Sequence, residues 1–98
     1  MEIKIQSVHF DADEKLVEFI NKKVAKLETY FDAIISTDVI LKLERTGQVQ
    51  DKVAEFKTII AGATLVAKET CKTFEEAVDL CAEAMRKQLI KHKEKVRN

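Results

Sequence analysis

The chain of 98 residues contains no proline and no tryptophan, and it has only two glycines and two cysteines. Proline and glycine are the residues that most often interrupt helices and strands, so their scarcity indicates long elements joined by few loops. The 46% of apolar and 35% of charged residues are typical of a folded globule and argue against a disordered chain. A chain of this length builds one modest core, and we expect a single domain over residues 1–98.

Long apolar runs are also missing. Residues 1–10 (MEIKIQSVHF) lack the unbroken apolar stretch of a signal peptide, and the longest nearly apolar run, residues 59–67, is far shorter than a membrane span. These features predict a cytoplasmic protein with no membrane partner. Cys71 and Cys81 stand ten residues apart without a CxxC motif, so we expect reduced thiols, with Cys81 in the core as a small hydrophobic residue.

Signatures of catalysis and of cofactor binding are absent from the sequence. His9 and His92 are far apart, and no glycine-rich phosphate loop or H-E-x-x-H motif occurs. Asp11, Asp13 and Glu14 fit the start of a helix, where carboxylates are favourable, better than they fit a metal site. We therefore predict that the protein is not an enzyme and uses no cofactor, no metal and no small-molecule substrate.

The charges are distributed unevenly, although the formal net charge is zero. Residues 86–97 (RKQLIKHKEKVR) hold six basic residues and one acidic residue, which leaves 11 basic and 16 acidic residues in the remainder. An electropositive surface attracts polyanions whatever the total charge is, so this end favours a nucleic-acid partner. A solvated helix end that complements the helix dipole is the alternative explanation.

Apolar residues at helical spacing predict two long helices. The first begins after Asp13, a good N-cap, and its apolar stripe continues to Tyr30 and Phe31. The second runs from Thr73, which forms a capping box with Glu76, to about residue 96. The members of the two stripes are Leu16, Phe19, Ile20, Val24, Leu27, Tyr30 and Phe31 in the first helix and Phe74, Ala77, Val78, Cys81, Met85, Leu89 and His92 in the second.

Alternation of polar and apolar residues predicts four strands, which gives the order β-α-β-β-β-α and an α+β fold. The turn signals Thr46-Gly47-Gln48 and Ala61-Gly62 join the last three strands into an antiparallel meander. A right-handed crossover through the first helix makes the first strand parallel to its neighbour. We expect both helices to cover one face of the four-stranded sheet, and the opposite face to be polar. The residues that mark this polar face are Lys42, Glu44, Glu55 and Lys57.

The basic residues of the first helix are segregated from its acidic ones. At 100° per residue, Lys15, Lys22 and Lys26 fall in a narrow arc beside Phe19, and the acidic residues fall on the other flank. Lys23 falls inside the apolar arc, where its side chain must either extend outward between the helices or meet a partner.

The second helix carries its cations in two stripes and is long enough to extend beyond the sheet. About 22 helical residues span about 33 Å, whereas an eight-residue strand spans about 26 Å. His92 lies on the apolar stripe of the second helix, where a packing role and an RNA contact are both open. Tyr30 is the one aromatic residue that could stack on a base, although core packing is favoured for it. The stripes consist of Lys87, Lys91 and Lys95 and of Arg86, Lys93 and Arg97. We expect the cations of both helices to form one surface.

Three segments of the chain resemble the short ribosome hibernation-promoting factors. They are FINKKVAKLETYFD at residues 19–32, VILKLE at 39–44 and QLIKHKEKV at 88–96. The resemblance implies a fold like that of double-stranded-RNA-binding domains and a position on the small ribosomal subunit between head and body. There such proteins occupy the mRNA and tRNA channel and silence translation in stationary-phase or stressed cells.

By this resemblance the rRNA contacts lie on both helices, and Arg86 is added from the charge distribution. The predicted rRNA-binding residues are Lys22, Lys23, Lys26, Arg86, Lys87, Lys91, His92, Lys93 and Lys95. The chain departs from the family pattern before the second helix, where Cys71, Thr73 and Glu75 replace glycine, aspartate and tyrosine. Thr73 can still cap the helix, whereas Glu75 removes any contact made by the ring.

The end of the chain at Asn98 fits the short form of the family, without an acidic tail or a second domain. Promotion of ribosome dimers and inactivation of single ribosomes both remain open. Two other functions are compatible with the sequence. One is a general double-stranded RNA-binding module, and the other is an adaptor that docks a polypeptide on the polar sheet face or on the acidic flank of the first helix.

Overall fold

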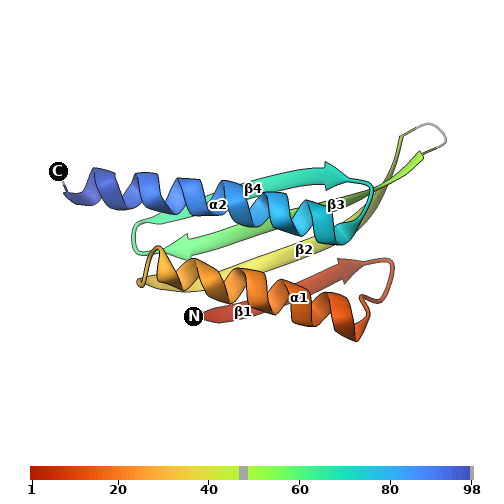
Figure 1. Cartoon of the computed structure of the whole chain (residues 1–98), viewed down its shortest axis with the longest axis horizontal. Coiled ribbons are helices and arrows are strands. Elements are labelled where there is room, and N and C mark those ends of the chain that lie inside the picture. Colours follow the sequence, from red (N-terminus) through yellow and green to blue (C-terminus); the bar gives the residue numbers. More distant parts are fainter. Residues whose placement is uncertain (47–48, 98) are drawn as a thin grey trace.

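The computed structural model describes residues 1–46 and 49–97 and has the predicted order of elements. The strands are β1 (Glu2–Val8), β2 (Ile34–Thr46), β3 (Val49–Ile60) and β4 (Ala63–Cys71), and the helices are α1 (Glu14–Ala25), the 3₁₀ turn η1 (Lys26–Thr29) and α2 (Phe74–Arg97). Figure 1 shows both helices on one face of the sheet, with α1 beside α2. The predicted α+β fold is therefore confirmed.

The four strands form one sheet in the order β1-β2-β3-β4. β1 is parallel to β2, and the other two neighbouring pairs are antiparallel, as the crossover and the meander predict. Gly62 in the β3–β4 turn has a φ of 80°, a backbone conformation that costs a glycine little. The predicted turn at Thr46-Gly47-Gln48 includes residues 47 and 48, which lie outside the described residues.

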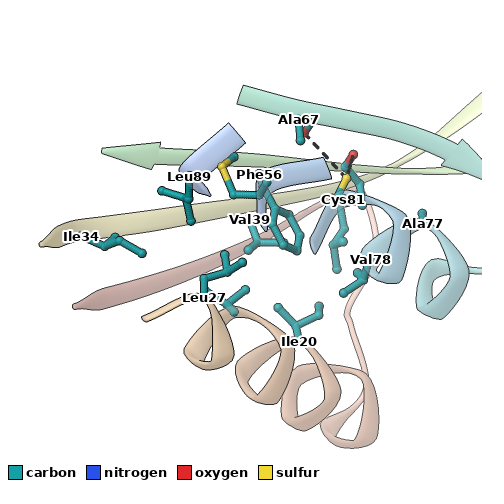
Figure 2. Packing of buried hydrophobic residues seen from close by; sticks show 14 of the residues in the cluster. Ile20, Leu27, Ile34, Val39, Phe56, Ala67, Ala77, Val78, Cys81 and Leu89 are labelled. Atoms are coloured by element: carbon teal, nitrogen blue, oxygen red, sulfur yellow. Dashed lines mark hydrogen bonds between the residues drawn. The ribbon is translucent and has the colours of Figure 1, made fainter. Parts of the chain in front are cut away.

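The core lies between the sheet and the two helices (Figure 2). Phe56 of β3 and Cys81 of α2 are fully buried in it, and Leu27 lies there although it belongs to η1. Each such apolar side chain contributes about 1.5–3 kcal/mol when it is removed from water. The core is what fixes the rotation of both helices on the sheet, and hence which of their other residues face solvent.

Both predicted helix starts are present. The Asp13 carboxylate accepts a hydrogen bond from the N–H of Leu16 at 2.8 Å, and the Thr73 hydroxyl accepts one from the N–H of Glu76 at 3.1 Å. Each bond satisfies one of the N–H groups that a helix leaves without a partner at its start. The residue at which each helix begins is thus set locally.

The end of α1 differs from the prediction. The α-helix ends at Ala25 and continues as the 3₁₀ turn to Thr29, whereas the apolar stripe predicted a helix that includes Tyr30 and Phe31. The Thr29 hydroxyl donates to the Lys26 carbonyl at 2.7 Å, which competes with the regular backbone hydrogen bonds of a helix. Tyr30 remains half-buried, so its apolar character was recognised correctly but its backbone conformation was not.

The hairpin of β2 and β3 is longer than expected, with 13 and 12 residues in its strands instead of about eight. The two strands pair along their whole length, so the ladder extends beyond the start of α2 at one end of the molecule (Figure 1). At the other end, α2 extends past the β3–β4 turn, as predicted (Figure 1). The C-terminal end of α2 therefore extends beyond the sheet (Figure 1).

The sheet face opposite the helices is polar, as predicted, but it contains one buried apolar residue. Glu44 and Lys57 are exposed there, and Lys42 and Glu55 are half-buried. Val53 alternates with the core residue Ala54, so it belongs to this outer face, yet it is fully buried. Its partner in β2 is Lys42, whose aliphatic stem can cover an apolar neighbour.

Candidate nucleic-acid interface

A cavity of about 330 Å³, open to solvent, lies between α1, η1 and α2, and we call it the interhelical hollow. Its apolar lining comes from Leu27, Tyr30 and Ala82. Its charged lining comes from Lys23, Lys26, Asp79, Glu83 and Arg86. Three of the nine predicted rRNA-binding residues thus meet here, and two carboxylates of α2 accompany them.

Lys23 lies in the gap between α1 and α2, at the angle that the helical arc predicts. Its Nζ is 2.8 Å from Oδ1 of Asp79 and 5.4 Å from the centre of the Phe19 ring. The structure thus gives Lys23 a partner within the chain. A phosphate that approaches Lys23 must compete with the Asp79 carboxylate for its ammonium group.

Arg86 is held by two neighbours. Its Nε donates to Oε2 of Glu83 at 3.1 Å and its Nη2 donates to Oε1, which forms a bidentate pair one helical turn long. Its guanidinium carbon lies 5.7 Å from the centre of the Tyr30 ring, within range of a cation–π contact. The hydrogen bond with Arg86 lowers the pKa of Glu83 below its ordinary value, so the pair is ionised at neutral pH. Glu83 therefore fixes the guanidinium at the hollow.

A second cavity of about 310 Å³ lies between α2 and β4, and we call it the β4-side hollow. It is lined by Leu65, Gln88, Lys91, His92 and Lys95. The amide of Gln88 donates to the carbonyl of Val66 at 2.8 Å, which ties this flank of α2 to β4.

His92 is half-buried and packs edge to face against Phe31, with 5.8 Å between the ring centres. This contact shows a packing role for the imidazole. Because His92 also lines the β4-side hollow, an RNA contact by the same residue stays a prediction.

Six of the nine predicted rRNA-binding residues thus form two groups, one in each hollow on either flank of α2, and the expectation of one continuous surface stays a prediction. Lys23, Lys26 and Arg86 line the interhelical hollow, and Lys22 is exposed one turn before Lys26. Lys91, His92 and Lys95 line the β4-side hollow, and Lys87 and Lys93 are exposed elsewhere on α2. The side chain of Arg97 lies outside the described part of the structure.

Sequence reasoning missed the two acidic members of the interhelical hollow. Neither Asp79 nor Glu83 is among the site residues predicted from the sequence. The spacing of Glu83 and Arg86 by three residues is a signal for their pair, because such residues are neighbours on a helix. No sequence signal identifies the pair of Lys23 with Asp79, because it depends on how the two helices lie against each other.

Within the described residues, no group of three His, Cys, Asp or Glu side chains is arranged to hold a metal ion. In the same part of the chain, no helix is both long and apolar enough to cross a membrane.

Comparison with known proteins identifies the family. The family model described as "Sigma 54 modulation protein / S30EA ribosomal protein" matches residues 3–97. The chain belongs to this family. The resemblance seen in the three sequence segments is therefore confirmed over nearly the whole chain.

Individual members of the S30EA family are similar along most of their length. A protein of Azotobacter vinelandii named "Ribosome hibernation promoting factor" is 34% identical over 95 residues, which are 97% of this chain and 85% of that protein. A protein of the same name from Escherichia coli (strain K12) is 31% identical over 97 residues, which are 99% of this chain and 98% of that protein.

Solved structures of similar proteins share the fold. A ribosomal subunit interface protein from Coxiella burnetii superposes with a TM-score of 0.85 at 22% identity and covers 95% of this chain and 98% of its own. The N-terminal domain of Protein Y from Thermus thermophilus superposes with a TM-score of 0.81 at 22% identity and covers 94% of this chain and 99% of its own.

Proposed function

We propose that this chain is a ribosome hibernation factor of the cytoplasm that binds the small ribosomal subunit in the mRNA and tRNA channel and silences translation. The observation that carries the proposal is the similarity over 97% to 99% of the chain to proteins named ribosome hibernation promoting factor. The function is one of binding, and no catalytic step is part of it.

The two cationic groups support a binding mode through rRNA phosphates. Lysines and one arginine are placed on both flanks of α2, whose basic end extends beyond the sheet. A helix that carries cations on two sides fits between two RNA segments, since each lysine can contact a phosphate as a point charge and Arg86 can bind or stack. We propose Lys22, Lys23, Lys26, Arg86, Lys87, Lys91, His92, Lys93 and Lys95 as the contact residues.

Co-sedimentation with purified ribosomal subunits in sucrose gradients, across a series of salt concentrations, tests the proposal. We expect the protein to pellet with the small subunit and to dissociate steeply as salt rises. Lys26→Glu and Lys91→Glu, one at each hollow, should both weaken binding. Lys57→Glu is the matched control, because Lys57 is exposed on the sheet face opposite the helices.

Each alternative has its own outcome in this experiment. Equal affinity for free duplex RNA and for small subunits would indicate a general double-stranded RNA-binding module. Binding that survives high salt would indicate a protein-docking adaptor. Equal weakening by all three charge reversals would contradict the assigned surface. The same gradients separate single ribosomes from dimers. They therefore also show whether the protein promotes ribosome dimers or inactivates single ribosomes.

A further inference from the structure

The size and lining of the interhelical hollow suit one flat ring system. Its volume of about 330 Å³ is at the lower end of the range of about 300–1,000 Å³ that is typical of small-ligand pockets. Leu27 and Ala82 line its apolar part, and the half-buried ring of Tyr30 stands beside them. A peptide helix or a duplex groove would need a longer concave surface, whereas a single nucleobase needs only this one.

Two side chains at the hollow are of the types that stack on bases. Tyr30 presents an aromatic ring, and Arg86 presents a guanidinium plane 5.7 Å from the centre of that ring. Glu83 holds the guanidinium by two hydrogen bonds, so Arg86 is ordered before any ligand arrives. Binding then loses less side-chain entropy than it would with a free arginine.

The charges around the hollow determine the orientation of a bound ligand. Asp79 and Glu83 lie on the α2 side and repel a phosphate. Lys26 lies on the η1 side, and Lys22 is exposed one turn before it. A ligand with an apolar ring and one anionic group therefore places its ring in the hollow and its anion toward η1.

We infer that the interhelical hollow takes up one unstacked nucleotide of RNA, with its base beside Tyr30 and Arg86 and its phosphate on Lys26 and Lys22. The inference rests on the proposed function for the source of the RNA. It differs from a set of phosphate contacts alone because it requires an empty hollow as well as positive charge.

Filling the hollow without changing any charge separates these two binding modes. Ala82→Leu replaces a methyl group of the lining with an isobutyl group, and Thr64→Leu introduces the same side chain at an exposed position of β4 as the matched control. Loss of one stacked base should weaken binding to the small subunit about tenfold in Ala82→Leu. Thr64→Leu should stay within about twofold of the unmodified protein. Equal pelleting of Ala82→Leu and the unmodified protein would overturn the inference.

Tyr30 gives a direct spectroscopic readout, because it is the only tyrosine and the chain has no tryptophan. Titration with an unpaired RNA tetranucleotide at low salt should quench the tyrosine emission to saturation, and Ala82→Leu should abolish the quenching. Emission that stays unchanged would count against the inference. Should Ala82→Leu fail to fold, Tyr30→Leu must weaken small-subunit binding about tenfold and Tyr30→Phe must retain it.

The outcomes distinguish this inference from the proposed function. Unmodified protein that does not pellet with small subunits refutes the proposed function, while the titration still tests the hollow. Unmodified protein that pellets, together with an Ala82→Leu variant that pellets equally well, refutes the nucleotide site and leaves the proposed function in place.

Discussion

Lys23 of α1 and Asp79 of α2 form an ion pair across the gap between the helices, with 2.8 Å between Nζ and Oδ1. Both side chains are well exposed, at 39% and 50%, so the pair contributes at most about 1 kcal/mol to stability. Its larger effect is on the charge that an approaching phosphate meets. Arg86 is paired with Glu83 in the same way, so two of the proposed contact residues are partly neutralised before RNA binds.

Asp79→Asn should therefore strengthen binding to the small subunit. The substitution frees the Lys23 ammonium and removes a negative charge that repels phosphate, and one such interaction at about 4 Å in water corresponds to about fivefold in affinity. The free energy of unfolding should change by less than about 1 kcal/mol. Co-sedimentation at low salt and denaturant unfolding measure the two quantities.

Asp11→Asn is the control for this prediction, because Asp11 is an exposed residue before α1 and its substitution removes the same charge. We expect Asp11→Asn to leave the affinity nearly unchanged. If Asp79→Asn and Asp11→Asn gave the same affinity, the carboxylate of Asp79 would have no local effect on the interface.

Local signals were sufficient to predict most of the helices from the sequence. Asp13 and Thr73 cap the N-termini through their own side chains, and helical spacing set the faces that follow. The same spacing placed Lys23 between the helices. The identity of its partner could not be predicted, because Asp79 is 56 positions away and the contact depends on the rotation of α2 on the sheet.

Non-local packing also explains the other differences. Spacing predicted two stripes of cations on α2, but which stripe faces α1 is set by the packing of both helices on the sheet, so the division into two hollows was not predicted. Alternation assigns Val53 to the polar face of the sheet. Only its pairing with Lys42 in β2 explains why its side chain is buried. The 3₁₀ turn after Ala25 has a local cause instead, because the Thr29 hydroxyl donates to the carbonyl of Lys26 three residues earlier.

Thr37 and Thr58 are the polar pair of the core, and they should be energetically coupled. Both are fully buried and lie opposite each other in β2 and β3, with 3.1 Å between their hydroxyl oxygens. The Thr37 hydroxyl is also placed to donate to the sulfur of Met1 at 3.4 Å, and either hydroxyl of the pair can donate to the other. Thr37→Val leaves the buried hydroxyl of Thr58 without its partner and should cost about 1–3 kcal/mol.

The double variant Thr37→Val/Thr58→Val should cost less than the sum of the two single changes, because it leaves no unpaired hydroxyl. Urea unfolding of the four proteins measures this coupling. Strictly additive free energies would contradict a hydrogen bond between the two residues.

Cys81 should make the protein less stable at high pH. Burial raises the pKa of its thiol from 9.0 to about 12, and the thiol points at the backbone carbonyls of Ala54 and Ala67, at 3.1 Å and 3.7 Å (Figure 2). Between these two values the unfolded chain loses a proton that the folded chain keeps, so stability falls with rising pH, by up to about 1.4 kcal/mol per pH unit. Below pH 9 the contribution is constant.

The difference in unfolding free energy between the unmodified protein and Cys81→Ala isolates this effect from the titration of the lysines. We expect this difference in free energy not to change with pH below pH 9. From pH 9 to 12 the unmodified protein should lose stability relative to Cys81→Ala. A difference that does not change with pH over that range would show that the thiol titrates alike in the folded and unfolded states.

The two cationic groups should contribute independently to the salt dependence of ribosome binding. Lys26 and Lys95 lie at different hollows on opposite flanks of α2, so removing one leaves the other in place. Each phosphate contact that is lost should reduce the slope of log affinity against log salt by about 0.7 to 0.9. Lys26→Ala and Lys95→Ala should each show this reduction, the double variant should show twice as much, and Lys57→Ala should show none. A double variant with the slope of a single one would mean that only one flank of α2 meets phosphate.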